Sequence, residues 1–278
     1  MTRHTGLLLP SFAGRNKEPA ERTYRALAHV VRVVMPWLGT TEWRDFSKLP
    51  QTGGIICVGN HISHFDPLVL GLGIIEGGRW PRFLGKVQIF RSPWIGWLAR
   101  ACGQIPVERG SVRAADSLLA AEAALDHGKA VALYPEGTLT GDPDEWPMSG
   151  RTGAARLALD TRVPVIPFGQ WGAQAFMPDG KKGFPLVLGR RHRFQVICGD
   201  PVDLTDLYGL PTNREVLEAA TTRIMDAITA LVAELREQEP PADRWSFRTR
   251  RREPVVRGAP SRVNGERGDS SADADEGP

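Results

Sequence analysis

Short apolar segments with the length of buried strands alternate with amphipathic stretches along the middle of this 278-residue chain. The strand-like segments are 55–58, 83–85, 130–134, 164–168 and 194–198. The helical stretches are clearest at 112–127, where Ser111 is the expected N-cap and Gly128 the expected end, at 153–161 and at 213–237. Strands and helices in alternation predict an α/β fold with a largely parallel central sheet flanked by helices.

An amphipathic helix is predicted for residues 19–39, after a flexible N-terminus at 1–18. Apolar side chains recur there at helical spacing, with Arg22, Arg25, His29 and Arg32 between them. Pro36 is expected to kink or end the helix. Two interpretations remain open: a helix that packs on the core, and an interfacial helix whose arginines lie near lipid phosphates.

A main domain is predicted for residues 40–237. From residue 238 onward the chain is first rich in arginine and then in Gly, Ser, Asp and Pro, with almost no apolar side chains to bury. This composition predicts a disordered tail over 238–278.

Composition narrows the class of protein. Hydrophobic residues make up 41% and charged residues 24%, which excludes a wholly disordered chain. The formal net charge of +3 is too mild to favour a nucleic-acid binder and suits an anionic membrane surface better. Cys57, Cys102 and Cys198 fit neither a disulfide framework nor a zinc site, and they suit a reducing cytoplasm. The chain has no apolar run that could span a bilayer and no signal-peptide core, so we do not expect it to cross a membrane, and binding to a membrane surface stays open.

A loop with two histidines follows the first strand-like segment, with the sequence GNHISHFDP at 59–67. His61 is a candidate general base, and Asp66 is a candidate carboxylate that fixes its tautomer. The structural alternative is that Asp66 caps a helix begun by Pro67 and that His61 only hydrogen-bonds the loop. A metal site of His61, His64 and Asp66 is disfavoured, because no other His or Cys cluster completes it. His64 is expected to be a solvated loop residue.

Three further blocks follow. GQIPVERG at 103–110 presents Arg109, whose guanidinium offers a fork for phosphate or pairs with Glu108 at the surface. LYPEGT at 133–138 places Glu136, Gly137 and Thr138 on a turn after a buried strand, which is either a ligand site or a plain turn. VPVIP at 163–167 is an apolar strand whose two prolines each lack an amide hydrogen, so it is expected at a sheet edge or in a pocket wall.

In this order the blocks resemble those of the glycerolipid acyltransferase family, and of the bacterial 1-acylglycerol-3-phosphate acyltransferases in particular. That family carries NHxxxxD, a Gly-x-Ile-Pro-Val-x-Arg-like block, Pro-Glu-Gly-Thr and a Val-Pro-Val-Ile-Pro-like strand, and all four appear here between Asn60 and Pro167. FLGK at 83–86 and TGAARLA at 152–158 are similar as well, so the resemblance covers about residues 20–205. It departs at Leu139-Thr140, where many relatives carry Arg-Ser, and this leaves the acceptor open.

The resemblance implies the glycerolipid acyltransferase fold, with 40–237 as the acyltransferase domain. It implies that His61 is the general base and that Asp66 orients it, while the strand at 163–167 borders the acyl-donor site. The residues that it implies for binding the acceptor and its phosphate are Lys86, Arg109, Glu136, Gly137 and Thr138.

The implied reaction moves a fatty acyl group from acyl-CoA or acyl-carrier protein to the free hydroxyl of 1-acyl-sn-glycerol-3-phosphate, giving phosphatidic acid for phospholipid biosynthesis. It needs neither metal nor cofactor, and the enzyme is expected to be peripheral or monotopic on the cytoplasmic face of the cell membrane. Two alternatives remain open: another lipid acceptor, such as a glycolipid or an amino lipid, and a catalytically silent lipid-binding protein. The intact His, Asp, Arg and Glu positions speak against the silent protein.

The segment FRSPWIGWLAR at 90–100 is a second candidate for membrane contact. Trp94 and Trp97 stand with aliphatic residues between arginines, and tryptophan favours the headgroup boundary of a bilayer. The alternative is a core helix whose tryptophans pack inside the protein.

Overall fold

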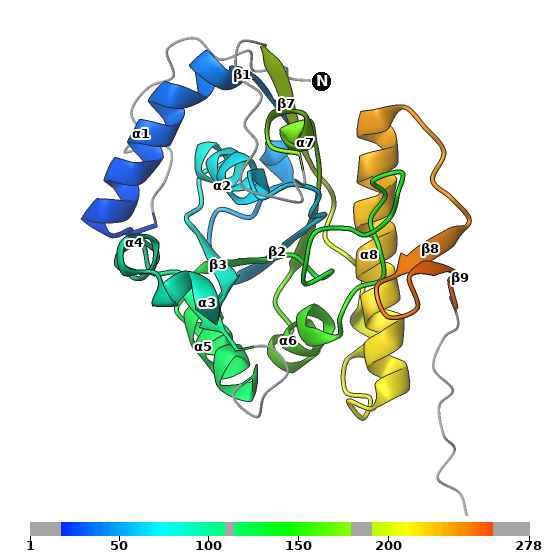
Figure 1. The fold of residues 1–278 in the computed structure, drawn as a ribbon. Helices are drawn as coiled ribbons and strands as arrows, with labels where there is room; N and C mark the ends of the chain where they lie inside the picture. The colour runs from blue at the N-terminus through cyan, green and yellow to red at the C-terminus, as the bar shows by residue number, and fades with distance from the viewer. Residues whose placement is uncertain (1–17, 109–113, 179–190, 258–278) are drawn as a thin grey trace, which may run out of the picture.

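A seven-stranded sheet forms the centre of the computed structural model, which describes residues 18–108, 114–178 and 191–257 (Figure 1). Its strand order is β1 (Gly39–Arg44), β7 (His192–Cys198), β6 (Val165–Trp171), β2 (Ile55–Gly59), β5 (Ala130–Leu133), β3 (Pro81–Lys86) and β4 (Ile105–Val107). All neighbouring pairs are parallel except β6 and β7, which are antiparallel. The prediction of a largely parallel α/β sheet is therefore confirmed.

Helices cover both faces of this sheet, because successive side chains of a strand point to opposite faces. Ile55 and Cys57 of β2 belong to a core shared with α1 (Arg22–Leu38), α2 (Asp66–Glu76) and α7 (Ala173–Phe176). Ile56 and Val58 belong to the opposite core, shared with α5 (Ala114–Asp126), α6 (Gly153–Thr161) and α8 (Arg214–Arg236). The short helices α3 (Val87–Arg91) and α4 (Pro93–Ala101) connect β3 to β4.

Helix boundaries agree with the local signals where the structure describes them. The Asn213 side chain accepts a hydrogen bond from the Val216 amide at 2.9 Å and caps α8, and Gly128 follows α5 with a φ of +72°. Ser111 lies outside the described residues. Pro36, however, does not stop α1, which runs on to Leu38. Pro36 stands in the last turn of α1: it removes the hydrogen bond that an amide there would donate to the Arg32 carbonyl, but only two helical residues follow it.

The expectation that the two prolines mark a sheet edge or a pocket wall is wrong. β6 lies inside the sheet, between β7 and β2. The antiparallel pairing with β7 begins only at Phe168, and the Pro167 carbonyl accepts from the Gly199 amide beyond the end of β7. On that side Pro167 therefore needs no amide hydrogen, so an interior strand tolerates it.

The predicted disorder of the tail is wrong for its first part, because β8 (Asp243–Ser246) and β9 (Arg251–Pro254) form a hairpin beside α8 (Figure 1). Arg252 forms a two-pronged ion pair with Asp142, at 2.8 Å for each bond, and Arg244 pairs with Asp226 of α8 at 2.7 Å. The arginines that suggested disorder thus bind carboxylates from distant parts of the chain. Residues 1–17 and 258–278 lie outside the described residues.

In the part of the chain that the structure describes, no helix is both long and apolar enough to cross a membrane.

Candidate active site

The carboxyl ends of three strands bring the sequence blocks together at one edge of the sheet. β2 pairs with β5 at Val58 and Leu133, and with β6 at Gly59 and Phe168. Because these strands are parallel, the loop after β2 and the turn after β5 emerge side by side.

Asn60 fixes the start of the loop. Its side-chain amide donates to the Gln170 carbonyl at 3.0 Å, and its side-chain oxygen accepts from the Gln170 amide at 2.8 Å. Both residues are buried. Asn60 was not assigned a role from the sequence, although it stands in the quoted block; here it ties the loop after β2 to the end of β6.

The Asp66 carboxylate holds His61 in one orientation. Its Oδ2 atom accepts from the amides of Ile62 (2.7 Å) and Ser63 (2.8 Å) and lies 2.9 Å from Nδ1 of His61. An ionised carboxylate can only accept, so Nδ1 carries the proton and Nε2 keeps the lone pair of a base. The carboxylate bonds back to the loop rather than forward into α2, so the helix-cap interpretation of Asp66 is wrong. The catalytic roles of both residues remain predictions.

Glu136 supports the same loop from the turn after β5. One carboxylate oxygen accepts from the His61 amide at 2.8 Å and the other from the Met148 amide at 2.9 Å. Burial raises the pKa of Glu136 to about 8, against the two amide donors, which lower it. The carboxylate is fully buried and does not reach the cavities described below, so the geometry makes Glu136 a positioning residue for His61 rather than a direct acceptor ligand.

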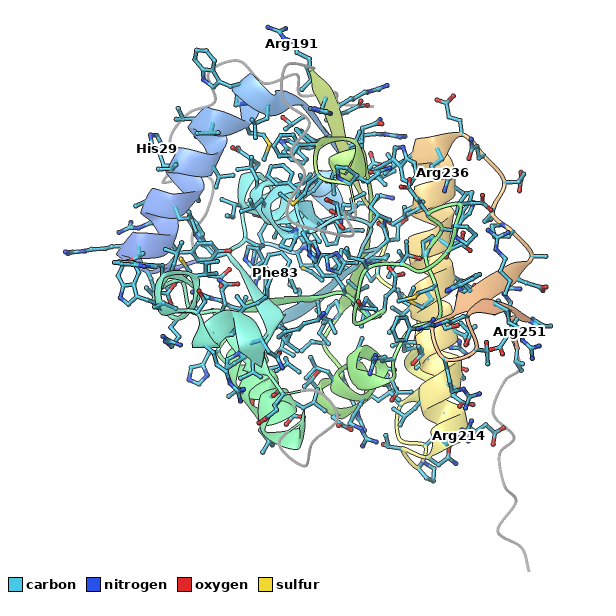
Figure 2. The ribbon with its side chains drawn as sticks, in the orientation of Figure 1. His29, Phe83, Arg191, Arg214, Arg236 and Arg251 are labelled. Carbon is cyan, nitrogen blue, oxygen red and sulfur yellow. The ribbon has the colours of Figure 1, made fainter. Side chains whose placement is uncertain are left out.

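Tyr134 is a site residue that the sequence analysis missed. Its ring stacks on the His61 imidazole, with ring centroids 4.1 Å apart and planes 9° apart, and the Phe83 ring also stacks against Tyr134, with centroids 6.1 Å apart. Phe83 is partly buried and is labelled near the middle of the view in Figure 2. Burial, followed by the charge of Asp66, raises the pKa of the Tyr134 phenol well above its ordinary value. Tyr134 is therefore a neutral wall that limits the movement of the imidazole.

An apolar cavity of about 640 Å³ begins at His61. Side chains of α1, α2, β3, α3 and α4 line it, among them Leu27, Val31, Leu72, Phe83, Phe90 and Leu98. Three lining residues, Leu68, Ile89 and Ile95, are exposed and form an apolar mouth. Such a cavity suits a hydrocarbon chain, because its walls offer almost only apolar contact.

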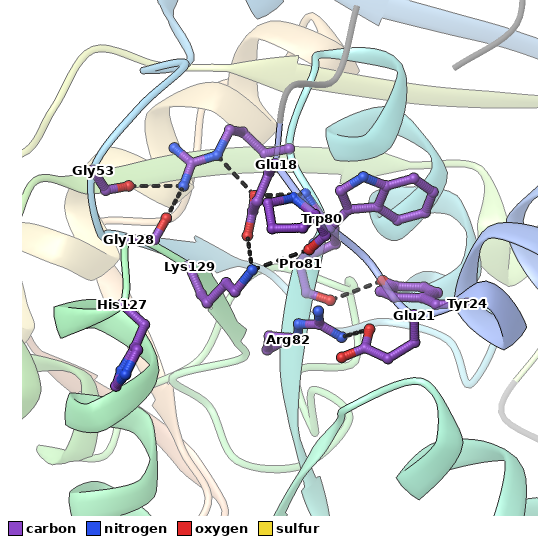
Figure 3. A network of polar contacts seen from close by, with 12 residues as sticks. Glu18, Glu21, Tyr24, Gly53, Trp80, Pro81, Arg82, His127, Gly128 and Lys129 are labelled. Carbon is purple, nitrogen blue, oxygen red and sulfur yellow. Dashed lines mark hydrogen bonds and ion pairs between the residues drawn. The ribbon is translucent and has the colours of Figure 1, made fainter. Parts of the chain in front are cut away.

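Ion pairs fix the α1 wall of this cavity to the domain (Figure 3). The Arg79 guanidinium pairs with Glu18 just before α1, and it also donates to the carbonyls of Gly53 and Gly128. Arg82 pairs with Glu21 at 2.6 Å, and the Tyr24 hydroxyl donates to the Pro81 carbonyl at 2.8 Å. The Arg79–Glu18 pair is buried, whereas Glu21 is 43% exposed; together with the Tyr24 hydrogen bond, the two pairs hold the start of α1 against the residues around β3.

A second cavity of about 440 Å³ adjoins the apolar one and is basic. The two share Lys86, Gly137 and Thr138 among their lining residues, and the role of these residues in binding the acceptor stays a prediction. Arg109 lies outside the described residues, directly after Glu108, which lines the second cavity.

His64 is exposed, as expected, and lines the apolar cavity. In the described part of the chain no three His, Cys, Asp or Glu side chains are grouped so that they could hold a metal ion.

The chain matches the family model described as Acyltransferase over residues 41–171. It is 24% identical over 208 residues to the 1-acyl-sn-glycerol-3-phosphate acyltransferase of Bacillus subtilis, covering 75% of this chain and 96% of that one. It is 31% identical over 133 residues to the lyso-ornithine lipid O-acyltransferase of Pseudomonas aeruginosa, covering 47% and 48%.

The fold agrees with these matches. It superposes on the crystal structure of the 1-acyl-sn-glycerophosphate (LPA) acyltransferase PlsC from Thermotoga maritima with a TM-score of 0.60 and 21% identity, covering 78% of this chain and 81% of that one. This likeness establishes the fold. The family-model match over residues 41–171 and the named relatives support the glycerolipid acyltransferase family.

The cysteines of this O-acyltransferase do not offer a second nucleophile. All three are buried, and burial raises the pKa of Cys102 to about 11 and those of Cys57 and Cys198 as well. The thiolate is the reactive form of cysteine, and a raised pKa keeps it scarce near neutral pH. The geometry thus favours direct attack by the acceptor hydroxyl, with His61 as base.

Proposed function

We propose that this acyltransferase moves a fatty acyl group from acyl-CoA or acyl-carrier protein to the free hydroxyl of 1-acyl-sn-glycerol-3-phosphate, giving phosphatidic acid. The observation that carries the proposal is the His61–Asp66 pair, whose His61 lines an apolar cavity that shares Lys86, Gly137 and Thr138 with a basic one. A phosphorylated lipid presents an apolar chain and an anion on either side of its reacting hydroxyl. The name of the Bacillus subtilis relative supports this acceptor.

The chemical step follows from the tautomer of His61. Nε2 takes the proton of the acceptor hydroxyl while its oxygen attacks the thioester carbonyl carbon. The tetrahedral intermediate then collapses, the carbon–sulfur bond breaks, and the imidazolium returns its proton to the leaving thiolate. Asp66 stabilises the imidazolium between these two transfers. The product is an ester and a free thiol, with no change of oxidation state.

The direct test is an acyl-transfer assay of the purified protein with labelled acyl-CoA and a panel of lysolipid acceptors. A lysophosphatidic acid, a lyso-ornithine lipid and a lysoglycolipid should be compared, with His61→Ala as the blank. Transfer to lysophosphatidic acid, absent in the blank, is the expected result. Transfer only to the lyso-ornithine lipid would replace the proposed acceptor with the one named for the Pseudomonas aeruginosa relative.

We further propose that the enzyme binds the cytoplasmic face of the cell membrane peripherally. Trp94 and Trp97 of α4 are 83% and 59% exposed, and Trp37 of α1 is 85% exposed. These values contradict the core-helix interpretation of the segment at 90–100. α1 and α4 lie along the same side of the molecule (Figure 1), and His29 projects outward from α1 (Figure 2).

The same surface adjoins the mouth of the apolar cavity. Ile95, which lines that mouth, stands on α4 between the two exposed tryptophans. The burial of Tyr24, Ala28 and Met35 shows that α1 packs on the core, and the exposure of other residues of α1 supports the proposal that it also contacts lipid. A lipid acceptor would therefore reach His61 from the bilayer without crossing water.

Vesicle binding tests this proposal. Binding should strengthen with anionic lipid and weaken, but not vanish, in high salt, because salt screens only the electrostatic contribution. Trp94→Ala with Trp97→Ala should weaken binding, whereas the control Leu119→Ala, which removes an exposed leucine of α5, should not. A double variant that is folded and binds vesicles like the parent would contradict the assignment of this surface.

A further inference from the structure

The basic cavity beside the active site contains cations that the sequence blocks do not assign. Besides the shared residues, it is lined by Gln88, Arg91, Glu108, Arg151 and Phe247. Its walls thus carry three basic side chains, those of Lys86, Arg91 and Arg151, against the one carboxylate of Glu108. Arg91 and Arg151 are exposed, and no ion pair or hydrogen bond is found for either guanidinium among the described residues.

Arg151 lies against the turn that follows β5. Its amide donates to the Pro135 carbonyl at 2.8 Å, which fixes its backbone beside that turn. A Cβ atom built on Gly137 would lie 2.7 Å from Nε of Arg151, so the guanidinium stem occupies the space that a side chain at 137 would need. Gly137 also has a φ of +77°, which independently favours glycine.

The position of Arg151 is tied to that of the catalytic base. The turn under its side chain carries Glu136, whose carboxylate accepts from the His61 amide. The C-terminal hairpin supports the segment just before Arg151, because the amide and hydroxyl of Ser149 both donate to the Trp245 carbonyl, at 2.8 and 3.1 Å. The hairpin also contributes Phe247 to the cavity wall, from beyond the family match at 41–171.

We propose that Arg151 binds a substrate phosphate group in this cavity while the reacting hydroxyl lies at His61. The inference rests on the proposed function, which supplies the two substrates considered: the phosphorylated acceptor and acyl-CoA. A guanidinium that has no partner among the described residues presents a planar fork that matches phosphate oxygens. Two sources share this chemistry: the phosphate of the acceptor, and the phosphates of the CoA part of the donor.

The test compares Arg151→Ala and Arg151→Lys with the parent. Arg156→Ala is the matched control, since Arg156 is an exposed arginine of α6 that does not line the cavity. In one arm, KM is measured for lysophosphatidic acid and for neutral monoacylglycerol with acyl-CoA. In the other, it is measured for acyl-CoA and for acyl-pantetheine, which lacks phosphate.

A lost hydrogen bond to a charged group at an exposed site should raise KM roughly tenfold for the phosphorylated member of one pair. KM for the substrate without phosphate should be unchanged, and Arg156→Ala should leave every KM as in the parent. Arg151→Lys should raise KM for the phosphorylated substrate less than Arg151→Ala does. A rise in KM for lysophosphatidic acid but not for monoacylglycerol identifies the acceptor phosphate as the ligand of Arg151. A rise for acyl-CoA but not for acyl-pantetheine identifies the phosphates of CoA. Unchanged KM values, or equal rises for both members of each pair, would overturn the proposal.

A binding measurement separates this inference from the proposed function. Glycerol 3-phosphate and CoA should each be tested for a rise in the melting temperature, with glycerol and pantetheine as controls. If the parent transfers no acyl group, the proposed function fails, but a phosphate-dependent rise that is smaller in Arg151→Ala still supports the site. No rise in the parent, or an equal rise in Arg151→Ala, refutes it.

Discussion

Replacing Asp66 with asparagine isolates the charge of the carboxylate from its hydrogen bonds. The amides of Ile62 and Ser63 both donate to Oδ2. In the variant these two donors require an oxygen at that place, so they select the rotamer that puts the carbonyl oxygen of the amide there. That oxygen can still accept from Nδ1 of His61, which keeps the tautomer of a base at Nε2. What Asp66→Asn removes is the negative charge.

The magnitude follows from the buried setting of the pair. Asp66 is fully buried and the His61 side chain is 16% exposed, so an effective dielectric constant of about 20 is suitable. At about 4 Å between charge centres, a carboxylate then stabilises an imidazolium by about 4 kcal/mol. This energy is gained only when His61 becomes charged, so kcat should fall by about three powers of ten.

The effect on stability should be smaller. The asparagine NH2 group takes the place of Oδ1, for which the described residues offer no hydrogen-bond partner. An unsatisfied buried donor costs about 1–3 kcal/mol. Asp66→Ala should be worse, because it leaves the two loop amides without their acceptor.

The assay combines single-substrate kinetics with urea unfolding of the parent, Asp66→Asn, Asp66→Ala and His61→Ala. His61→Ala should be folded and lose the ~10²–10⁴-fold contribution of a positioned base. If Asp66→Asn is folded and its kcat lies within tenfold of the parent, the imidazolium is not stabilised by Asp66 and the mechanism is refuted. An activity loss that merely follows the unfolded fraction would make Asp66 structural.

Three further outcomes are expected. Arg109→Lys should raise KM for a phosphorylated acceptor more than for a neutral monoacylglycerol, because the planar fork is lost; equal losses in kinetic assays would make Arg109 structural. Turnover should survive EDTA, and activity restored only by a divalent ion would contradict a metal-free base. Because burial raises the pKa of Glu136 from 4.5 to about 8 in the folded state, the contribution of Glu136 to the free energy of unfolding should be full below pH 4.5 and be lost as pH rises from there through 8. Glu136→Gln should flatten that profile in urea titrations between pH 5 and 9.

Local signals in the sequence were sufficient for most helices and inner strands. The helix predicted at 153–161 coincides with α6, and the Asn213 cap and the Gly128 end are found where the capping rules place them. These features depend on neighbouring residues alone. β1 was not predicted, because Trp43 is the only strongly apolar residue of GTTEWR; the segment becomes a strand through parallel pairing with β7, more than 150 residues away.

The reactive residues of the site could be predicted from the sequence, but the residues that hold them in place could not. The spacing of His61 and Asp66 suggested a contact because five residues can fold back across one turn, and the structure contains it. Tyr134 gave no such signal, since an aromatic residue after a buried strand is equally suited to a core. Its stacking on His61 arises only because β2 and β5 are neighbours in the sheet.

Glu136 shows why a motif can identify a residue correctly and still mislead about what it does. Within a Pro-Glu-Gly-Thr turn, a carboxylate beside glycine suggests direct contact with a ligand. The second oxygen of Glu136, however, is bound by the Met148 amide, twelve residues further on. The segment after Met148 is fixed in turn by the Ser149 hydrogen bonds to Trp245 in the hairpin. The orientation of His61 thus depends on a hairpin in a segment whose composition predicts disorder. That prediction fails because the arginines of the segment pair with carboxylates that are distant in sequence and come close only in the folded protein.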